Sequence, residues 1–146
     1  MRLRIAWVQA RPGKDKLPAF RELTREYMER LGRYTPVESQ ELRNEAGLMK
    51  ARREREFLVV LDARGRQLTS EELAEFLQAH QVRSTEQMLF AIGGADGFSA
   101  EARRAADFQL SLGPMTLPHE LARVVLLEQL YRAFTILKGH PYHTGH

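Results

Sequence analysis

Cysteine is absent from the sequence. A disulfide scaffold, a thiol nucleophile and cysteine-bound zinc or iron–sulfur centres are therefore excluded. Long apolar runs are missing too, since none approaches the roughly 20 residues that a helix needs to cross a bilayer. The start of the chain has only about half the apolar core of a secretory signal peptide, and no cleavage site follows it. These absences predict a cytoplasmic protein that does not associate with membranes.

A large excess of charge of one sign is also lacking. The chain has 22 basic and 19 acidic residues, which leaves a net charge of +3. This is less than we expect of a protein that holds nucleic acid by charge alone. Residues 1–73 contain 16 of the basic side chains and 12 acidic ones. Any affinity for a polyanion is therefore biased to the amino-terminal half.

The length of 146 residues fits one domain, because two domains of half that size would each have a thin core. Apolar segments alternate between strand-like and helix-like patterns, and the run Phe57–Asp62 is typical of a strand buried on both faces. Strands are predicted at residues 2–8, 35–42, 57–62, 88–94 and 108–112, and helices at 18–33, 44–56, 69–80, 99–106 and 118–138. We therefore expect a single α/β domain over residues 1–146, built on a parallel sheet.

The last predicted helix is apolar nearly all round. Such a helix is buried, either in the core of its own chain or against another subunit. A chain of this length offers few elements to cover it, which favours a dimer interface.

Three loops lie at the carboxyl ends of predicted strands, at residues 61–66, 92–98 and 112–119. Ligands of open parallel sheets bind beyond the carboxyl ends of the strands, where glycine lets backbone N–H groups approach a ligand closely. Gly93 and Gly94 are equally compatible with a simple turn from strand to helix. The phosphate-binding glycine motifs are missing. A nucleoside bound through its base and sugar remains open.

Four of the five histidines lie near the carboxyl terminus, at His119, His140, His143 and His146. They lack the spacing of a metal-binding helix and have no carboxylate close by in sequence, so no metal site is predicted. The terminal group is either a surface tail or a tail folded over a site, with imidazole and phenol groups for stacking and proton transfer.

Several basic residues, Lys50, Arg52, Arg53 and Arg55, alternate with glutamates. This pattern fits a solvated helix face, and it also fits a surface that contacts RNA phosphates. Arg123 and Arg132 are further candidates for ordinary ion pairs, because Glu128 and Arg132 have i,i+4 spacing on a helix.

Taken in order, the motifs of the carboxyl-terminal two thirds resemble one family. They are Leu61-Asp62, Ile92-Gly-Gly-x-x-Gly97, Leu110-Ser-Leu-x-x-Met-Thr-Leu-Pro-His119-x-Leu-x-Arg123, Glu128-Gln-Leu-Tyr-Arg-Ala133 and His140-Pro-Tyr-His143. This series closely resembles the ribosomal RNA large subunit methyltransferase H family of the SPOUT superfamily. The resemblance covers essentially the whole chain and is most specific in 116–119 together with 140–143.

The resemblance implies an α/β methyltransferase with a carboxyl-terminal trefoil knot that acts as a homodimer. It implies transfer of a methyl group from S-adenosylmethionine to N3 of a pseudouridine, in a stem–loop of 23S rRNA within the assembled ribosome. By the family's cofactor contacts, the matching positions here are Leu61, Gly94, Gly113, Pro114, Met115, Thr116, Leu117 and Pro118. These positions lie in the three loops that the strand ends had already indicated.

Methylation at N3 requires a group that takes the proton of that nitrogen. The candidates are His143, Tyr142 and His119, with His143 first because imidazole accepts protons near neutral pH. Tyr142 is also suited to stacking on the base. RNA contacts are expected from Arg52, Arg53, Arg123 and His140. With little net charge, the protein is predicted to methylate assembled ribosomes and not naked rRNA.

One position departs from the family pattern. Members usually follow His-Pro-Tyr-His with a basic residue, and this chain has Thr144 there. Either His146 or a basic residue of a partner subunit substitutes for it, or the contact is absent. Two other functions remain open, a non-catalytic ribosome-associated RNA-binding module and a small enzyme that acts on a free nucleoside.

Overall fold

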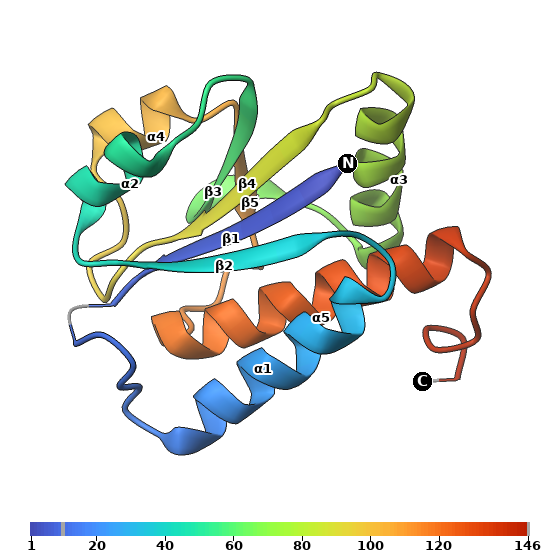
Figure 1. Ribbon diagram of the computed structural model, residues 1–146, viewed down its shortest axis with the longest axis horizontal. Helices are drawn as coiled ribbons and strands as arrows, with labels where there is room; N and C mark the ends of the chain where they lie inside the picture. The colour runs from blue at the N-terminus through green and yellow to red at the C-terminus, as the bar shows by residue number, and fades with distance from the viewer. Residues whose placement is uncertain (10, 146) are drawn as a thin grey trace.

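Five parallel strands form one sheet in the computed structural model, which describes residues 1–9 and 11–145 (Figure 1). They are β1 (Arg2–Val8), β2 (Val37–Leu42), β3 (Glu56–Gln67), β4 (Gln87–Ile92) and β5 (Phe108–Ser111). Their order is β2-β1-β4-β3-β5, and every neighbouring pair runs parallel. The parallel α/β sheet predicted from the alternation of strands and helices is confirmed.

Helices cover both faces of this sheet (Figure 1). One face packs against α1 (Pro18–Gly32), α3 (Ser70–Val82) and α5 (His119–Leu137), and the strand side chains on that face include Leu3 and Ile5. The other face packs against the short helices α2 (Glu45–Ala51) and α4 (Ala100–Ala105). Among the described residues, no helix is long and apolar enough to cross a bilayer.

Local sequence signals begin three of these helices. Thr69 caps α3 in the predicted capping box, accepting from the N–H of Glu72 while the Glu72 carboxylate accepts from the N–H of Thr69. The side chains of Asn44 and Ser99 cap α2 and α4 in the same way. Such caps satisfy N–H groups that have no partner within a helix.

Helix α2 ends earlier than the predicted limit at residue 56. The buried guanidinium of Arg4 donates to the carbonyl of Ala51 at 2.8 Å and forms an ion pair with Glu56 at 2.6 Å. Arg52 is already extended, and β3 begins at Glu56. A long-range buried ion pair therefore ends the helix, and no signal inside the segment itself marks this point.

Strand β3 is longer than predicted and contains a bulge. Leu61 and Arg66 both pair with Leu110 of β5, so residues 62–65 protrude from the ladder. A Cβ added at Gly65 would lie 2.5 Å from the carbonyl oxygen of Gln109. Only glycine allows the bulge to approach β5 this closely.

The apolar helix α5 is buried within its own chain. Ten of its 19 residues are buried, and its apolar side chains join the core beneath α1 and α3. Of the two explanations that its composition left open, the core of the same chain accounts for most of this surface.

Candidate functional site

A cavity of about 310 Å³ lies at the carboxyl ends of β3, β4 and β5. The bulge of β3, the loop after β4 and the loop between β5 and α5 all contribute to its wall, so the three predicted loops converge. Six of the eight residues matched to the family's cofactor contacts line it, namely Leu61, Gly94, Gly113, Met115, Thr116 and Leu117. The two prolines, Pro114 and Pro118, are outside the lining.

The glycines of the loop after β4 form a tight turn. Gly97 donates its N–H to the carbonyl of Gly94 at 2.9 Å and has a φ of 71°. A Cβ at Gly93 would lie 2.9 Å from the carbonyl carbon of Gly97. These glycines therefore fit both interpretations, the simple turn and the ligand loop, because the residues that make the turn also expose their backbone to the cavity.

A fixed carboxylate borders the same cavity. Asp62 accepts hydrogen bonds from the backbone N–H and the Nε of Arg64, both at 2.9 Å. These hydrogen bonds hold the pKa of Asp62 below its ordinary value despite burial. Asp62 and Asp96 line the cavity as acceptors, and neither was predicted from the sequence to be a site residue. The Asp62 position directly after the apolar run of β3 was the available signal.

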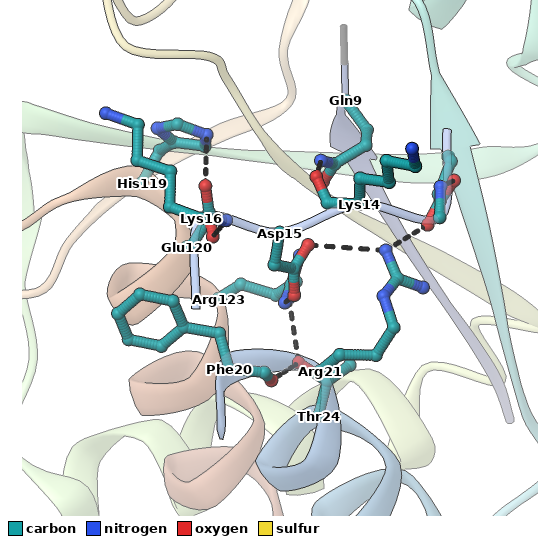
Figure 2. A network of polar contacts seen from close by, with 12 residues as sticks. Gln9, Lys14, Asp15, Lys16, Phe20, Arg21, Thr24, His119, Glu120 and Arg123 are labelled. Atoms are coloured by element: carbon teal, nitrogen blue, oxygen red, sulfur yellow. Dashed lines mark hydrogen bonds and ion pairs between the residues drawn. The ribbon is translucent and has the colours of Figure 1, made fainter. Parts of the chain in front are cut away.

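His119 is the one predicted proton-transfer group that lines this cavity. It is the first residue of α5, and its Nε2 lies 3.6 Å from Oε1 of the buried Glu120. The other oxygen of Glu120 accepts the backbone N–H of Lys16 at 2.9 Å. The loop before α1 and the first turn of α5 are thus joined at the cavity (Figure 2).

Tyr142 packs against the middle of α5. Its hydroxyl donates to Glu128 at 2.7 Å, and its ring meets Tyr131 edge to face at 4.8 Å. The guanidinium of Arg132 lies 4.9 Å from the centre of the same ring. Burial and the hydrogen bond to Glu128 both raise the pKa of Tyr142, so its phenol stays protonated near neutral pH.

His143 is held between two helices. Its Nδ1 is 3.0 Å from Nη1 of Arg132, and its Nε2 is 2.7 Å from Oε1 of Glu71 in α3. Because arginine only donates, Nδ1 is the acceptor and Nε2 carries the proton. His140 is exposed, and its Nδ1 accepts the N–H of Tyr142 at 3.2 Å.

The tail leaves the carboxyl-terminal end of α5 (Figure 1). It folds back so that Tyr142 contacts Glu128, nine residues after His119 and roughly 14 Å from it along the helix. No described residue of the tail lines the cavity. The structure brings His119 to the predicted cofactor residues, and it does not bring Tyr142, His143 or His140 to them.

Arg123 is not available to RNA, and the prediction that it contacts RNA is wrong. Its side chain is 1% exposed, and Nη2 lies 2.5 Å from Oδ2 of Asp15, which is equally buried. Its Nε donates to Thr24 (Figure 2). Its guanidinium also lies 4.7 Å from the ring of the buried Trp7. The ordinary ion-pair interpretation was the correct one here, with a partner 108 residues away.

The other predicted basic contacts are partly engaged in ion pairs. Arg52 binds Asp107 at 2.9 Å, and Arg53 binds Glu38 at 2.6 Å with about half of its side chain exposed. The i,i+4 pair of Arg132 and Glu128 is confirmed at 2.7 Å. Within residues 1–9 and 11–145, no cluster of three or more His, Asp or Glu side chains could hold a metal ion.

The structure describes Thr144, the position at which the tail departs from the family pattern. Thr144 donates its hydroxyl to the carbonyl of Pro141 at 3.1 Å, which turns it back on the tail itself. The expectation that His146 replaces the usual basic residue lies outside the described residues.

Comparison with known proteins agrees with this architecture. A family model described as "Predicted SPOUT methyltransferase" matches residues 1–143. A protein of Koribacter versatilis named ribosomal RNA large subunit methyltransferase H is 50% identical, with all of both chains covered. Its namesake in Geotalea daltonii is 43% identical over 98% of this chain and 99% of its own.

Solved structures show a similar fold at low sequence identity. A probable methylase family protein from Haemophilus influenzae has a TM-score of 0.61 and 12% identity, covering 96% of this chain and 69% of its own. The SpoU methyltransferase AviRb from Streptomyces viridochromogenes, solved with AdoMet, has a TM-score of 0.52 and 16% identity, covering 88% and 56%. The match along nearly the whole sequence, together with the parallel sheet and the cavity at its carboxyl edge, shows that this chain belongs to the ribosomal RNA large subunit methyltransferase H family of SPOUT methyltransferases.

Proposed function

We propose that this protein is an S-adenosylmethionine-dependent methyltransferase of ribosomal RNA. The substrate is N3 of pseudouridine 1915 in a stem–loop of 23S rRNA, reached within the assembled ribosome in the cytoplasm. The observation that carries this proposal is the convergence of three family-matched loops on one cavity. The name shared by relatives of up to 50% identity supports the same reaction.

The cavity suits the methyl donor. Its volume of about 310 Å³ is at the lower end of the roughly 300–1,000 Å³ of small-molecule sites. Gly94 and Gly113 leave backbone groups uncovered, and Gly113 has a φ of 131° that other residues rarely adopt. Leu61, Leu117 and Met115 supply apolar surface beside the acceptors Asp62 and Asp96. Backbone donors with apolar walls fit an adenosine, and carboxylates fit its hydroxyl groups or an ammonium.

S-adenosylmethionine supplies an electrophilic methyl group, whose bond to sulfur breaks as the bond to N3 forms. The chain contributes position, since an in-line displacement gains much of its rate from alignment. It also contributes a group that takes the proton of N3. His119 reaches the cavity of its own chain, with the carboxylate of Glu120 beside it.

A homodimer would complete this site with the tail of the second copy. His143 and Tyr142 do not line the cavity of their own chain, and Tyr142 contacts Glu128, roughly 14 Å along α5 from His119. In this proposal they meet the methyl donor that another subunit holds. Exposed apolar side chains near the cavity support such an interface. Met115 is 80% exposed and Leu17 is 55% exposed, and both adjoin the first turn of α5. Because the chain belongs to this family, we also propose that its carboxyl-terminal portion forms a trefoil knot.

The test is transfer of labelled methyl groups from S-adenosylmethionine to assembled ribosomes, naked 23S rRNA and free nucleosides in parallel. We expect label in ribosomes, at N3 of one pseudouridine, and far less in the other two. Calorimetry should show one saturable donor site per chain. Donor binding without transfer to any acceptor would contradict the enzyme, and labelled nucleosides would indicate a different substrate.

A further inference from the structure

The loop that joins β1 to α1 has a cluster of cations. Arg11, Lys14 and Lys16 are exposed, and none of them has an ion pair among the described residues. We call residues 11–16 the basic loop. With Asp15 as its single acidic residue, it carries a net charge of +2, whereas the whole chain carries +3. The net charge of this short loop is therefore nearly as large as that of the whole chain.

The carboxylate of Asp15 does not neutralise these cations. Its side chain is 1% exposed and faces inward, where it pairs with Arg123 at 2.5 Å and with Arg21 at 3.3 Å (Figure 2). The negative charge is satisfied inside the protein. Lys14 and Lys16, which flank Asp15 in sequence, keep their charge toward solvent.

The backbone of the basic loop is fixed from three sides. The side chain of Gln9 donates to the carbonyl of Lys14 at 2.5 Å, and the N–H of Gly13 donates to Glu41 at 2.9 Å. The N–H of Lys16 donates to Glu120 at 2.9 Å. These contacts tie the loop to β1, β2 and α5. A loop held in this way loses little further conformational freedom when it binds a partner.

The basic loop is connected to the cavity wall through Glu120. This carboxylate holds the backbone of Lys16 and also lies 3.6 Å from His119, a residue of the cavity wall (Figure 2). Lys14 and Lys16 do not line the cavity themselves, so their ammonium groups do not occupy the space assigned to the methyl donor.

We propose that the basic loop binds the phosphate backbone of the RNA whose base enters the cavity. The inference rests on the proposed function for the identity of that RNA. Phosphate contacts set the register of a protein on RNA without reading its sequence. Two solvent-facing lysines on a loop with a fixed backbone, beside the reacting base, fill this role. The loop thereby takes the part that the sequence had suggested for Arg123.

The test compares cosedimentation with assembled ribosomes over a series of salt concentrations. The variant is Lys14→Ala/Lys16→Ala. Its control is Arg83→Ala/Arg104→Ala. It removes two exposed cations, one directly after α3 and one in α4, that have no ion pair among the described residues. We expect the lysine variant to bind ribosomes about tenfold more weakly, with a salt slope smaller by roughly one per lysine. The control should bind like the parent. Equal binding by both variants would overturn the proposal.

Donor affinity, measured by calorimetry on the same proteins, separates a phosphate from the carboxylate of the methyl donor. Unchanged donor affinity together with weaker ribosome binding supports the proposal. Weaker donor affinity with unchanged ribosome binding overturns it and assigns the lysines to the donor. Methyl transfer by the unmodified protein is scored separately. Lysine-dependent ribosome binding without any transfer would leave the loop assignment standing and refute the enzymatic function.

Discussion

The two ends of α5 differ in what they offer a reaction. At the amino-terminal end there is a cavity with glycine-rich walls, one imidazole and a buried ion pair. Toward the carboxyl-terminal end there are the phenol of Tyr142 and the imidazole of His143, which do not line that cavity. One end can hold a small molecule and the other can move a proton or stack on a base. The cavity end combines the proposed donor site with one candidate proton acceptor, His119, and the tail offers a second imidazole and a ring for stacking.

The ends also differ in how firmly they are built. Asp15 and Arg123 are 1% exposed, whereas the Glu71 side chain that holds His143 is 60% exposed. Exposed pairs contribute little to stability, and buried ones cannot lose a partner without a large cost. The cavity end is therefore rigid, and the tail can exchange its present contacts for those of another surface at small cost.

Mixing two inactive variants tests whether the two ends work together across subunits. Thr116→Trp fills the cavity and His143→Ala removes the tail imidazole, and each should reduce transfer at least ~100-fold on its own. If the tail serves the partner's cavity, an equal mixture of reassociated subunits recovers about a quarter of the parent activity. About half of the dimers are then mixed, and one of the two sites in each mixed dimer is intact. Transfer to ribosomes before and after subunit exchange measures this. No recovery would place the tail and cavity of one chain in the same site.

Removing the buried cation tests the rigidity of the cavity end. Arg123→Met should lower the free energy of unfolding by about 3–5 kcal/mol, because it leaves the carboxylate of Asp15 buried with less compensation. Urea denaturation gives the value. Arg53→Ala is the control, since its pair with Glu38 is half exposed and should be worth less than about 1 kcal/mol. Equal losses in the two variants would contradict the contrast between buried and exposed pairs.

The bulge of β3 offers a smaller test of the same end. Gly65→Ala puts a Cβ against the backbone of Gln109, and we expect a loss of about 1–3 kcal/mol together with weaker donor binding. Gly32→Ala is the matched control. Its Cβ would have nothing nearer than 3.9 Å, and the substitution should stabilise the protein by roughly 0.5 kcal/mol. Unfolding and calorimetry on the pair distinguish a required close approach from a general effect of glycine.

A pH series addresses the tail end. Burial of Glu128 opposes its charge, but hydrogen bonds from Arg132 and Tyr142 outweigh burial and lower its pKa. The stabilisation is therefore present above the pKa of an unfolded glutamate, about 4.3, and is lost as the pH falls below it. Glu128→Gln should cost about 1 kcal/mol at neutral pH and progressively less in acid. Glu75→Gln, at an exposed position of α3, should stay within about 0.5 kcal/mol of the parent throughout.

Much of the fold could be predicted because its signals are local. The apolar runs of β3 and β4 and the cap at Thr69 depend on neighbouring residues. The early end of α2 and the bulge of β3 depend on Arg4 and on the backbone of β5, which are far away in sequence. No periodicity within a segment records such contacts.

The candidate site likewise has parts that local sequence signals predict and parts that depend on distant residues. The rule that ligands bind beyond parallel strands located the cavity loops, since strand direction follows from the α/β pattern. The burial of Arg123 could not be predicted, because it depends on where the loop containing Asp15 folds. The absence of His143 from the cavity wall could not be predicted either, because the helix predicted between His119 and His143 does not fix how the tail folds after it.

The position of Trp7 has a practical consequence. It is the single tryptophan of the chain, and it lies buried with the guanidinium of Arg123 4.7 Å from its ring. Its fluorescence therefore originates at one place, beneath the basic loop and the first turns of α5. A change in emission when a methyl donor or a ribosome is added would report on that place without any attached dye. Movements of the tail at the far end would leave the same signal unaltered.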